Sequence, residues 1–457
     1  MKKRVYIKNY GCQMNLYDSN RMLDILISCG YEHVSDCYLA DLVILNTCYI
    51  REKSYEKIFS DLGRVKKIQD ERRLDGSDII ISVSGCVAQA GAKEIRRRAP
   101  YIDIIFGPQV YHRLPYFLSK VLNYRKLNKK SFYFFGARIL DIDFPIKSKF
   151  SHLKFPKAKG VSSFISIQEG CDKFCHFCVV PYTRGAEVSR PIKDIIFEAT
   201  LLVEQGVKEI ILLGQNVNAY HGKNSKGKFM SLSSLLYFLS EIKGLERLRY
   251  ITSHPKEMSD DLIASHKQNS KLMPYLHLPI QSGSNRILKS MNRGHTVEYY
   301  KLIVEKLRLY CPNIVFSSDF IVGYPGESDQ DFEETLKLIK YIIYQGQSFS
   351  FKYSSRLGTP AAELKEQVKE DIKLERLEII QKLLSQQQKK FNSSLLGTMQ
   401  PVLIEKYGRK KNQKIGLSPY AQVIYFEDYN DDYNIGDFVQ VQIEESGLKS
   451  LGGRLIL

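Results

Sequence analysis

The N-terminal part of the chain repeats one hydrophobic pattern. Three apolar runs rich in β-branched residues, "RVYIKNYGC", "DLVILNTC" and "DIIISVSGC", each end at a cysteine. Short runs of this kind are typical of buried strands. The cysteines are Cys12, Cys48 and Cys86, and the spacings of 36 and 38 residues leave room for a strand, a crossover helix and two loops. The pattern therefore predicts three βα units of a parallel sheet.

The three cysteines share one position in this repeat, the carboxyl end of a strand. All strands of a parallel sheet point the same way, so their carboxyl ends gather along one edge, where such sheets bind ligands. We therefore expect the three thiols to converge. The alternative is that they are three buried structural cysteines.

A second series of apolar runs begins near Phe164, and each run ends in small or polar residues. Helical periodicity follows all but the last run, for example in 194–205, 257–268 and 328–344. Six such units predict a partial or full α/β barrel, whose functional residues lie on the loops at the carboxyl ends of the strands. The runs are "FISIQEG", "EIILLGQN", "RLRYITSHP", "PYLHLPIQSGS", "NIVFSSDFIVGYPGE" and "SFSFKYSSR".

The remaining segments suggest a linker, a helix and a third domain. The stretch around 123–159 is rich in Lys, Pro and aromatic residues without a clear period, which is typical of a linker. Leu and Ile recur at helical spacing in the charged segment 363–391, which predicts a helix on the flank of the barrel. Beyond Leu395, short strands with Gly, Asn and Asp between them predict a small β-barrel.

The patterns together predict an α/β protein of several domains. We expect a three-layer parallel α/β domain at 3–121, a linker at 122–156, a (β/α)6-type partial TIM barrel at 157–390, and a small, OB-like all-β barrel at 391–457. A chain of 457 residues also exceeds what one hydrophobic core usually supports.

The charge of the chain favours a polyanionic partner. There are 67 Lys and Arg against 50 Asp and Glu, a formal net charge of +17. Such an excess favours nucleic acid through counterion release, although a generally basic proteome would give the same excess. "MKKRVYIKNYGC" lacks the uninterrupted apolar core of a secretory signal, and no apolar run reaches membrane-spanning length. We expect a cytoplasmic protein that does not enter a membrane.

Three further cysteines, Cys171, Cys175 and Cys178, lie in "EGCDKFCHFC". Metal cages of sulfur normally use four ligands, so this set is one short. His176 would complete a zinc site, but a ligand next to Cys175 would strain a tetrahedral cage. The spacing C-x3-C-x2-C at the top of a barrel suits instead a 4Fe-4S cluster bound through three irons. Three cysteines fit neither set and are expected to be packing or surface residues: Cys29, Cys37 and Cys311.

"CDKFCHFC" resembles the signature of the radical S-adenosylmethionine (SAM) superfamily. Nine further motifs extend the resemblance over nearly the whole chain to the methylthiotransferases of that superfamily, including a C-terminal stretch similar to a TRAM domain. The motifs are "NYGCQMNLYDS", "NTCYIREKS", "SGCVAQ", "CVVPYTRGAEVSRP", "LLGQNVNAY", "TSHP", "LPIQSGS", "MNRGHT" and "GYPGE".

This resemblance implies two 4Fe-4S clusters with different tasks. Cys171, Cys175 and Cys178 would hold the first, whose open iron chelates SAM, so that one electron yields a 5′-deoxyadenosyl radical. The cysteines at the ends of the first three strands would hold the second, whose open iron carries sulfur that is methylated and then transferred to carbon. The implied reaction is methylthiolation of carbon 2 of N(6)-dimethylallyladenosine at position 37 of tRNA.

Other substrates and another class of protein remain open at this point. Within the family the alternatives are threonylcarbamoyl-adenosine in tRNA and an aspartate of a ribosomal protein. A non-catalytic, zinc-bearing RNA-binding protein is the alternative from a different class. The resemblance also implies an electron donor such as a flavodoxin or ferredoxin, and we expect a monomer.

Several residues around the barrel mouth are candidates for binding SAM. By analogy with the family, Phe177 would lie along the adenine, whereas its alternative role is packing. Polar residues within or at the ends of strands are cofactor candidates for which structural hydrogen bonding is the alternative. The strand-end motifs Gly214–Asn216 and Gly323–Glu327 are further candidates, although Gly-rich turns are common after strands. His254 and His277 are more typical of satisfied core histidines. The polar candidates are Gln215, Ser253, Gln281, Asp319, Gly323 and Glu327.

The basic residues suggest where RNA binds. Arg184, just after the cysteine loop, could bind a carboxylate or phosphate, or make a loop salt bridge. "KYGRKKNQK" at 406–414 holds five Lys or Arg in nine residues between strands of the C-terminal barrel, and could track phosphates without reading bases. We expect Arg409, Lys410 and Lys411 to contact the anticodon stem-loop, and the target adenosine to flip out toward the radical. Solvated charge runs are the alternative, as for 64–67, 96–98 and 124–130.

Overall fold

A computed structural model gives the fold for residues 2–49, 52–127, 138–145, 149–152, 155–356 and 358–456. The chain forms two compact units. The N-terminal unit comprises 1–157, 169–172 and 179–188, and the C-terminal unit comprises 158–168, 173–178 and 189–457. Within the described part of the chain, no helix is long and apolar enough to cross a membrane.

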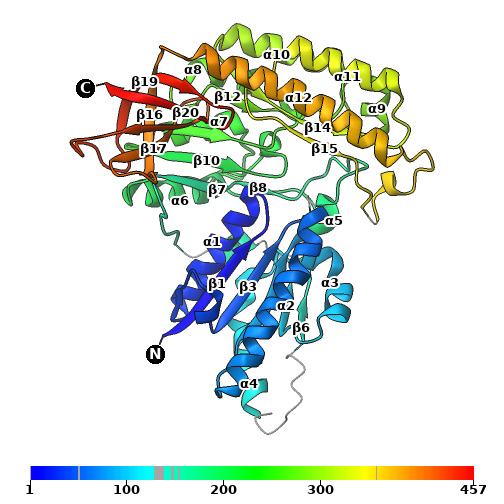
Figure 1. Ribbon diagram of the computed structural model, residues 1–457, viewed down its shortest axis with the longest axis vertical. Helices are drawn as coiled ribbons and strands as arrows, with labels where there is room; N and C mark the ends of the chain where they lie inside the picture. The colour runs from blue at the N-terminus through cyan, green and yellow to red at the C-terminus, as the bar shows by residue number, and fades with distance from the viewer. Residues whose placement is uncertain are drawn as a thin grey trace. The chain divides into compact units, whose positions relative to one another are not determined.

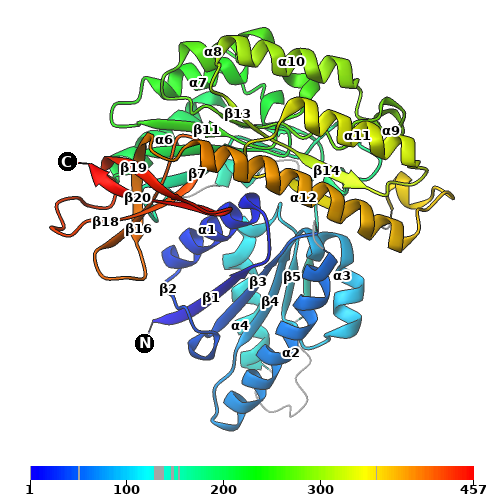
Figure 2. The same ribbon diagram turned by 45° about the horizontal axis from the view of Figure 1, so that its top comes forward.

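The N-terminal unit contains a six-stranded sheet in the order β2-β1-β3-β4-β5-β6 (Figure 1 and Figure 2). Every pair of neighbouring strands is parallel. The strands are β1 (Lys3–Asn9), β2 (Tyr31–His33), β3 (Leu42–Thr47), β4 (Ile80–Gly85), β5 (Ile104–Phe106) and β6 (Ile139–Asp141).

Alternating side chains of this sheet fill two separate cores. Leu42 and Ile44 pack with α1 (Gln13–Ser28) and α4 (Leu114–Leu127) on one face. Val43 and Leu45 pack with α2 (Glu52–Leu74) and α3 (Cys86–Arg98) on the other. Helices therefore cover both faces of the sheet, which confirms the prediction of a three-layer α/β domain. Strands buried on both faces read as continuous apolar runs, and this is the pattern seen in the sequence.

The segment predicted to be a linker contributes to this sheet. The last turns of α4 and the edge strand β6 both fall within 122–156. The rest of that segment lies largely outside the described residues, as does part of the basic run 124–130. The domain boundaries stay a prediction.

The C-terminal unit contains six parallel strand positions of a partial α/β barrel (Figure 2). Two of its elements, β13 and β14, are consecutive pieces of one strand position on either side of Ser318. The strands are β7 (Ser162–Ser166), β10 (Glu209–Leu213), β11 (Arg247–Tyr250), β12 (Tyr275–His277), β13 (Val315–Ser317), β14 (Asp319–Val322) and β15 (Phe349–Lys352).

Helices follow the strands and bury an apolar face against them. This arrangement confirms the predicted barrel and the flanking helix. The helices are α6 (Ile192–Glu204), α7 (Leu232–Ser240), α8 (Asp260–Gln268), α9 (Asn285–Ser290), α10 (Val297–Tyr310), α11 (Asp329–Ile342) and α12 (Glu370–Ser394).

The C-terminal domain is a closed barrel of five strands in the order β16-β17-β18-β20-β19. The sequence indicated only three of them, in "MQPVLIEKYG", "QVIYFED" and "DFVQVQIEES", because β17 and β20 contain glycines that read as turn residues. At Gly416 a Cβ would lie 2.1 Å from the Leu403 carbonyl oxygen, so the close approach of β16 requires glycine there. The strands are β16 (Met399–Tyr407), β17 (Gln413–Leu417), β18 (Val423–Glu427), β19 (Phe438–Ser446) and β20 (Ser450–Ile456).

Two buried arginines of β11 join the small barrel to the α/β barrel. Arg247 donates to the carbonyl oxygens of Leu417 and Pro401 at 2.7 and 2.8 Å. Arg249 donates to Ser418 O at 2.8 Å and to Pro419 O at 2.6 Å. At the end of α12, Asn392 Nδ2 donates to Gly447 O at 2.7 Å. The C-terminal barrel is therefore fixed to the α/β barrel by buried hydrogen bonds as well as by the chain.

Candidate active site

The three N-terminal cysteines lie at the carboxyl ends of three adjacent strands, as predicted. Cys12 precedes α1, Cys48 directly follows β3, and Cys86 begins α3 directly after β4. Two glycines allow the loops that precede Cys12 and Cys86 to approach the end of β3. A Cβ at Gly11 would lie 2.7 Å from Cys48 Sγ, and one at Gly85, whose φ is +91°, would lie 2.2 Å from Thr47 O. The backbones before Cys12 and Cys86 therefore both press against the end of β3.

Asn15, in the first turn of α1, connects these strand ends. Its Nδ2 donates to Thr47 O at 2.7 Å, and its Oδ1 accepts from the Cys12 thiol at 3.7 Å and from Arg184 Nη2 at 2.8 Å. Burial raises the pKa of the Cys86 thiol, and the neighbouring Cys48 and burial raise that of Cys12. Thiols kept neutral in this way ionise when they bind a metal, because the metal supplies the compensating positive charge.

This donor set fits an iron-sulfur cluster. Among the residues that the structure describes, no three His, Cys, Asp or Glu side chains are placed to hold a single metal ion. In a cubane each thiolate binds a different iron atom, so its cysteines surround a larger group. Thiols from three separate strand ends match that requirement. That Cys12, Cys48 and Cys86 hold one cluster, and Cys171, Cys175 and Cys178 another, stays a prediction.

Arg184 belongs to a buried ion-pair network in the N-terminal unit. It ends α5 (Val180–Arg184), is 3% exposed, and contacts Asp18 at 2.9 Å and Glu169 at 2.6 Å. Lys149 completes the network, at 3.0 Å from Asp18 and 2.8 Å from Glu169. The guanidinium thus makes salt bridges inside the protein, which was the alternative considered for it, and is not presented at the surface to RNA.

The cysteines of the C-x3-C-x2-C loop are divided between the units. Cys171 belongs to the N-terminal unit, where its N–H donates to Gly185 O at 3.2 Å. Cys175 and Cys178 belong to the C-terminal unit, where the Cys178 N–H donates to Cys175 O at 2.9 Å.

His176 anchors the cysteine loop to the C-terminal end of α9. Its N–H donates to Met291 O at 3.0 Å and its Nδ1 lies 2.8 Å from Ser290 O. Phe177, half-buried, packs beside a small apolar cluster, in agreement with the packing alternative. Its contact with adenine stays a prediction. The apolar cluster consists of Ile287, Met291, Tyr324, Tyr353 and Ala361.

Polar side chains without partners lie at the ends of three adjacent barrel strands. Within the described structure, Ser166 Oγ at the end of β7, both side-chain polar atoms of Asn216 after β10, and Ser253 Oγ after β11 are buried and neither donate nor accept a hydrogen bond. Such groups are rare in folded proteins, and a bound ion, a water molecule or a catalytic role can account for them. Ser253 was a sequence candidate and Asn216 belongs to the strand-end motif Gly214–Asn216 that the sequence indicated, whereas Ser166 was missed, although it lies within the first apolar run of the barrel.

The remaining candidates around the barrel mouth make local contacts. The Gln215 N–H donates to Gln168 Oε1 at 2.9 Å. Gln281 has φ +81° and its N–H donates to Asp319 O at 3.0 Å. Asp319 Oδ1 lies 3.2 Å from His277 Nε2. These contacts fix the strand ends, and binding of SAM by these residues stays a prediction.

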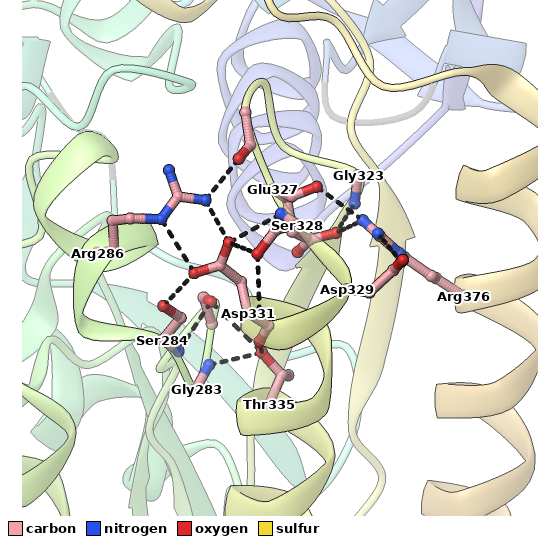
Figure 3. Close-up of polar contacts among 12 residues, drawn as sticks. Gly283, Ser284, Arg286, Gly323, Glu327, Ser328, Asp329, Asp331, Thr335 and Arg376 are labelled. Carbon is pink, nitrogen blue, oxygen red and sulfur yellow. Dashed lines mark hydrogen bonds and ion pairs between the residues drawn. The ribbon is translucent and has the colours of Figure 1, made fainter.

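The motif Gly323–Glu327 is fastened to α12 by a buried acid (Figure 3). Glu327 Oε2 accepts from the Gly323 N–H at 2.6 Å and from Arg376 Nη1 at 2.7 Å. Arg376 also contacts Asp329 at 2.7 Å. The carboxylate of Glu327 is therefore occupied by the protein itself, which is the structural alternative considered for it.

A second acid, Asp331, holds the neighbouring loop (Figure 3). It forms a capping box with Ser328 at the start of α11, accepts from Ser284 Oγ at 2.6 Å and pairs with Arg286. Burial opposes its ionisation, but the hydrogen bonds from Arg286, Ser284 and Ser328 hold the pKa of Asp331 below its ordinary value. The loops after β12 and β14 are thus tied together.

The basic loop of the C-terminal barrel is the turn between β16 and β17. Arg409, Lys410 and Lys411 are exposed there. Lys414, counted with them in the sequence, is instead buried in the barrel, at 2.6 Å from Asp428 and 2.8 Å from Asp431. The prediction of five loop cations is therefore wrong for Lys406, which lies in β16, and for Lys414, whose position in β17 turns it inward.

Models of known families match three parts of the chain. The Radical SAM superfamily matches 165–339, the TRAM domain matches 393–456, and the uncharacterized protein family UPF0004 matches 4–107. The parallel barrel with three cysteines after its first strand is thus that of a radical SAM protein.

Full-length relatives narrow this class. A tRNA-2-methylthio-N(6)-dimethylallyladenosine synthase of Agrobacterium fabrum is 51% identical over 98% of this chain and 96% of its own. One of Rickettsia canadensis is 52% identical over 100% of both chains. The chain belongs to the family of tRNA-2-methylthio-N(6)-dimethylallyladenosine synthases, so the resemblance seen in the sequence is confirmed.

Solved structures share the fold at much lower identity. The radical SAM methyltransferase TsrM of Kitasatospora setae, with cobalamin and a 4Fe-4S cluster bound, has a TM-score of 0.56 at 13% identity, over 79% of this chain and 74% of its own. The cobalamin-dependent SAM radical enzyme OxsB has a TM-score of 0.52 at 12% identity, over 83% and 56%. These likenesses concern the fold alone.

Proposed function

We propose that this protein replaces the hydrogen on carbon 2 of N(6)-dimethylallyladenosine, at position 37 of tRNA, with a methylthio group. The observation that carries the proposal is the identity of 51 to 52% to synthases of this nucleoside over essentially the whole chain. The positions of the two cysteine sets at strand ends support it. Other nucleosides, or a ribosomal protein, would be outcomes of the test below.

Cys171, Cys175 and Cys178 would hold the cluster of the radical site. When bound, this group supplies the electron that cleaves SAM to methionine and the 5′-deoxyadenosyl radical, which takes the hydrogen from carbon 2. The chain's own part is to bind SAM. The unpartnered groups of Ser166, Asn216 and Ser253 are available to its polar atoms.

Cys12, Cys48 and Cys86 would hold the second cluster, which supplies the sulfur. A methyl group from a further SAM molecule completes the methylthio group. Asn15 and the glycines Gly11 and Gly85 position these thiols. A flavodoxin or ferredoxin would donate electrons to a monomeric protein in the cytoplasm.

Anaerobic reconstitution with a defined anticodon stem-loop tests the proposed function. The RNA carries N(6)-dimethylallyladenosine, and its nucleosides are analysed by mass spectrometry after incubation with SAM and a low-potential reductant. We expect the 2-methylthio derivative together with 5′-deoxyadenosine. If the stem-loop stays unmodified while RNA with threonylcarbamoyl-adenosine is converted, the substrate proposed here is wrong.

The loop between β16 and β17 gives a prediction for RNA binding. Replacing Arg409, Lys410 and Lys411 by Gln should weaken tRNA binding and reduce the slope of log K against log salt by up to about 2, because each lost single-strand phosphate contact removes ~0.7. Titrations at several salt concentrations measure the slope. The matched control is the triple variant R409K/K410R/K411R, which keeps the charge and should keep the slope. An unchanged slope in the Gln variant would exclude this loop from the RNA interface.

A further inference from the structure

Arg293 carries a buried positive charge beside a cysteine of the radical site. It lies in "MNRGHT", after α9, and is 7% exposed. Its Nη1 donates to Cys175 Sγ at 3.5 Å and its Nη2 to Pro279 O at 2.7 Å. Its Nε is buried and donates to no described atom. Among the described residues, no carboxylate forms an ion pair with Arg293.

Most other buried arginines of the described residues have carboxylate partners, although Arg247 has carbonyl acceptors only. Arg184 pairs with Asp18 and Glu169, Arg249 with Glu209, and Arg376 with Glu327. A buried charge costs several kcal/mol unless an opposite charge and hydrogen bonds compensate it. Among the described residues, the one contact of Arg293 that can carry negative charge is the sulfur of Cys175, so Arg293 is placed as one half of an ion pair with it.

The histidines near Arg293 do not supply that negative charge. The rings of His254 and His295 meet edge to face at 5.5 Å. Burial and then Arg293 lower the pKa of His254, and burial and then Arg293 lower the pKa of His295 to about 4. Both imidazoles are neutral at physiological pH and add no positive charge beside the guanidinium. Lys173 and Lys256 also lower the pKa of His254, and Lys173 pairs with Glu257.

We propose that Arg293 is the counter-charge of the cluster that Cys175 helps to hold, and that it raises the reduction potential of that cluster. An oxidised cubane with three thiolates has a net charge of minus one, which one guanidinium balances, and the electron that enters on reduction adds a second negative charge. A nearby cation stabilises that added charge. Hydrogen bonds to sulfur and net charge are known determinants of such potentials.

In this role Arg293 is a positioning residue that acts through Cys175. The inference rests on the proposed function only in that the loop binds a cluster. The redox step is the transfer of one electron from an external low-potential donor, and no bond to Arg293 forms or breaks. "MNRGHT" supported the family resemblance in the sequence, but its arginine had no assigned role.

Redox titration of the anaerobically reconstituted protein, without SAM or RNA, tests this inference. To observe one cluster, the variants are built in protein with C12A, C48A and C86A. Electron paramagnetic resonance follows the reduced cluster. For Arg293→Met we expect the ratio of reduced to oxidised cluster at a fixed potential to fall about tenfold or more, which is ~59 mV for one electron. Arg293→Lys, which keeps the charge, should recover most of that loss.

Lys289→Met is the matched control. It removes one positive charge from the exposed face of α9, four residues before Arg293. Water and salt screen that charge, so the potential should stay at the parental value. An equal shift in Lys289→Met would mean that general charge, rather than the contact with Cys175, sets the potential.

The outcomes separate the inference from the proposed function. A cluster whose potential is unmoved in Arg293→Met, even if SAM binds more weakly, overturns the counter-charge role. If Arg293→Met loses its iron, Arg293→Gln replaces it, because this side chain can still donate to sulfur but has no charge; an unmoved potential there overturns the inference. Parental protein that binds no reducible cluster overturns both proposals.

Discussion

Protein in which Cys171, Cys175 and Cys178 are all replaced by Ala should form no 5′-deoxyadenosine from SAM, yet still bind about four irons per chain after anaerobic reconstitution. The physical reason is that the two cysteine sets stand on different strands. Cys171, Cys175 and Cys178 lie after the first barrel strand, whereas Cys12, Cys48 and Cys86 are held by the parallel sheet through Asn15 and close glycine contacts. Iron and sulfide analysis, with chromatography of the nucleoside products, measures both properties.

The variant that lacks the other three cysteines is the control. Replacing Cys12, Cys48 and Cys86 by Ala should also leave about four irons, but should keep 5′-deoxyadenosine formation and abolish the methylthio product. If both triple variants lose all iron, or if the first still cleaves SAM, the division of tasks between the sets is wrong.

Arg184→Met should destabilise the N-terminal unit by about 3–5 kcal/mol, because it leaves Asp18 and Glu169 buried with only Lys149 for compensation. The guanidinium contacts both carboxylates and Asn15, so its removal also loosens the residue that touches Cys12. Hydrogen exchange measured by mass spectrometry should show faster exchange in peptides covering β3 and β4. Peptides covering β10 should exchange as in the wild type.

An exposed arginine of the same unit provides the control. Arg97, on α3, pairs with Glu94 at 2.7 Å, but its side chain is 73% exposed. Surface pairs contribute ~0–1 kcal/mol, so Arg97→Met should leave exchange in β3 and β4 almost unchanged. If Arg184→Met behaves in the same way, the buried network does not stabilise the sheet.

The sequence predicted the features that follow from hydrophobic periodicity and from the position of a residue at the end of a strand. Parallel strands buried on both faces read as continuous apolar runs, so β3 and β4 and the cysteines at their ends could be found without coordinates. The strand-end rule also located Ser253. These predictions depend on local pattern and on the common direction of parallel strands.

Other features depend on contacts between distant segments, which one sequence does not contain. Arg184 and Asp18 are 166 residues apart in the sequence, so the sequence could not distinguish a buried ion pair at Arg184 from a site that binds phosphate. Lys414 looked like a member of a basic loop until its strand turned it toward Asp428. The glycines that hid β17 and β20 are explained only by the neighbouring strands.

The long helix α12 contacts both the barrel mouth and the small barrel. Arg376, near its start, binds the Glu327 turn at the barrel mouth, and Asn392, near its end, binds the β19–β20 turn of the small barrel. At a rise of ~1.5 Å per residue, these two contacts lie about 24 Å apart along one rigid helix. This separation would set how far RNA bound by the small barrel lies from the barrel mouth, so that the choice of nucleotide would depend on length as well as on base identity.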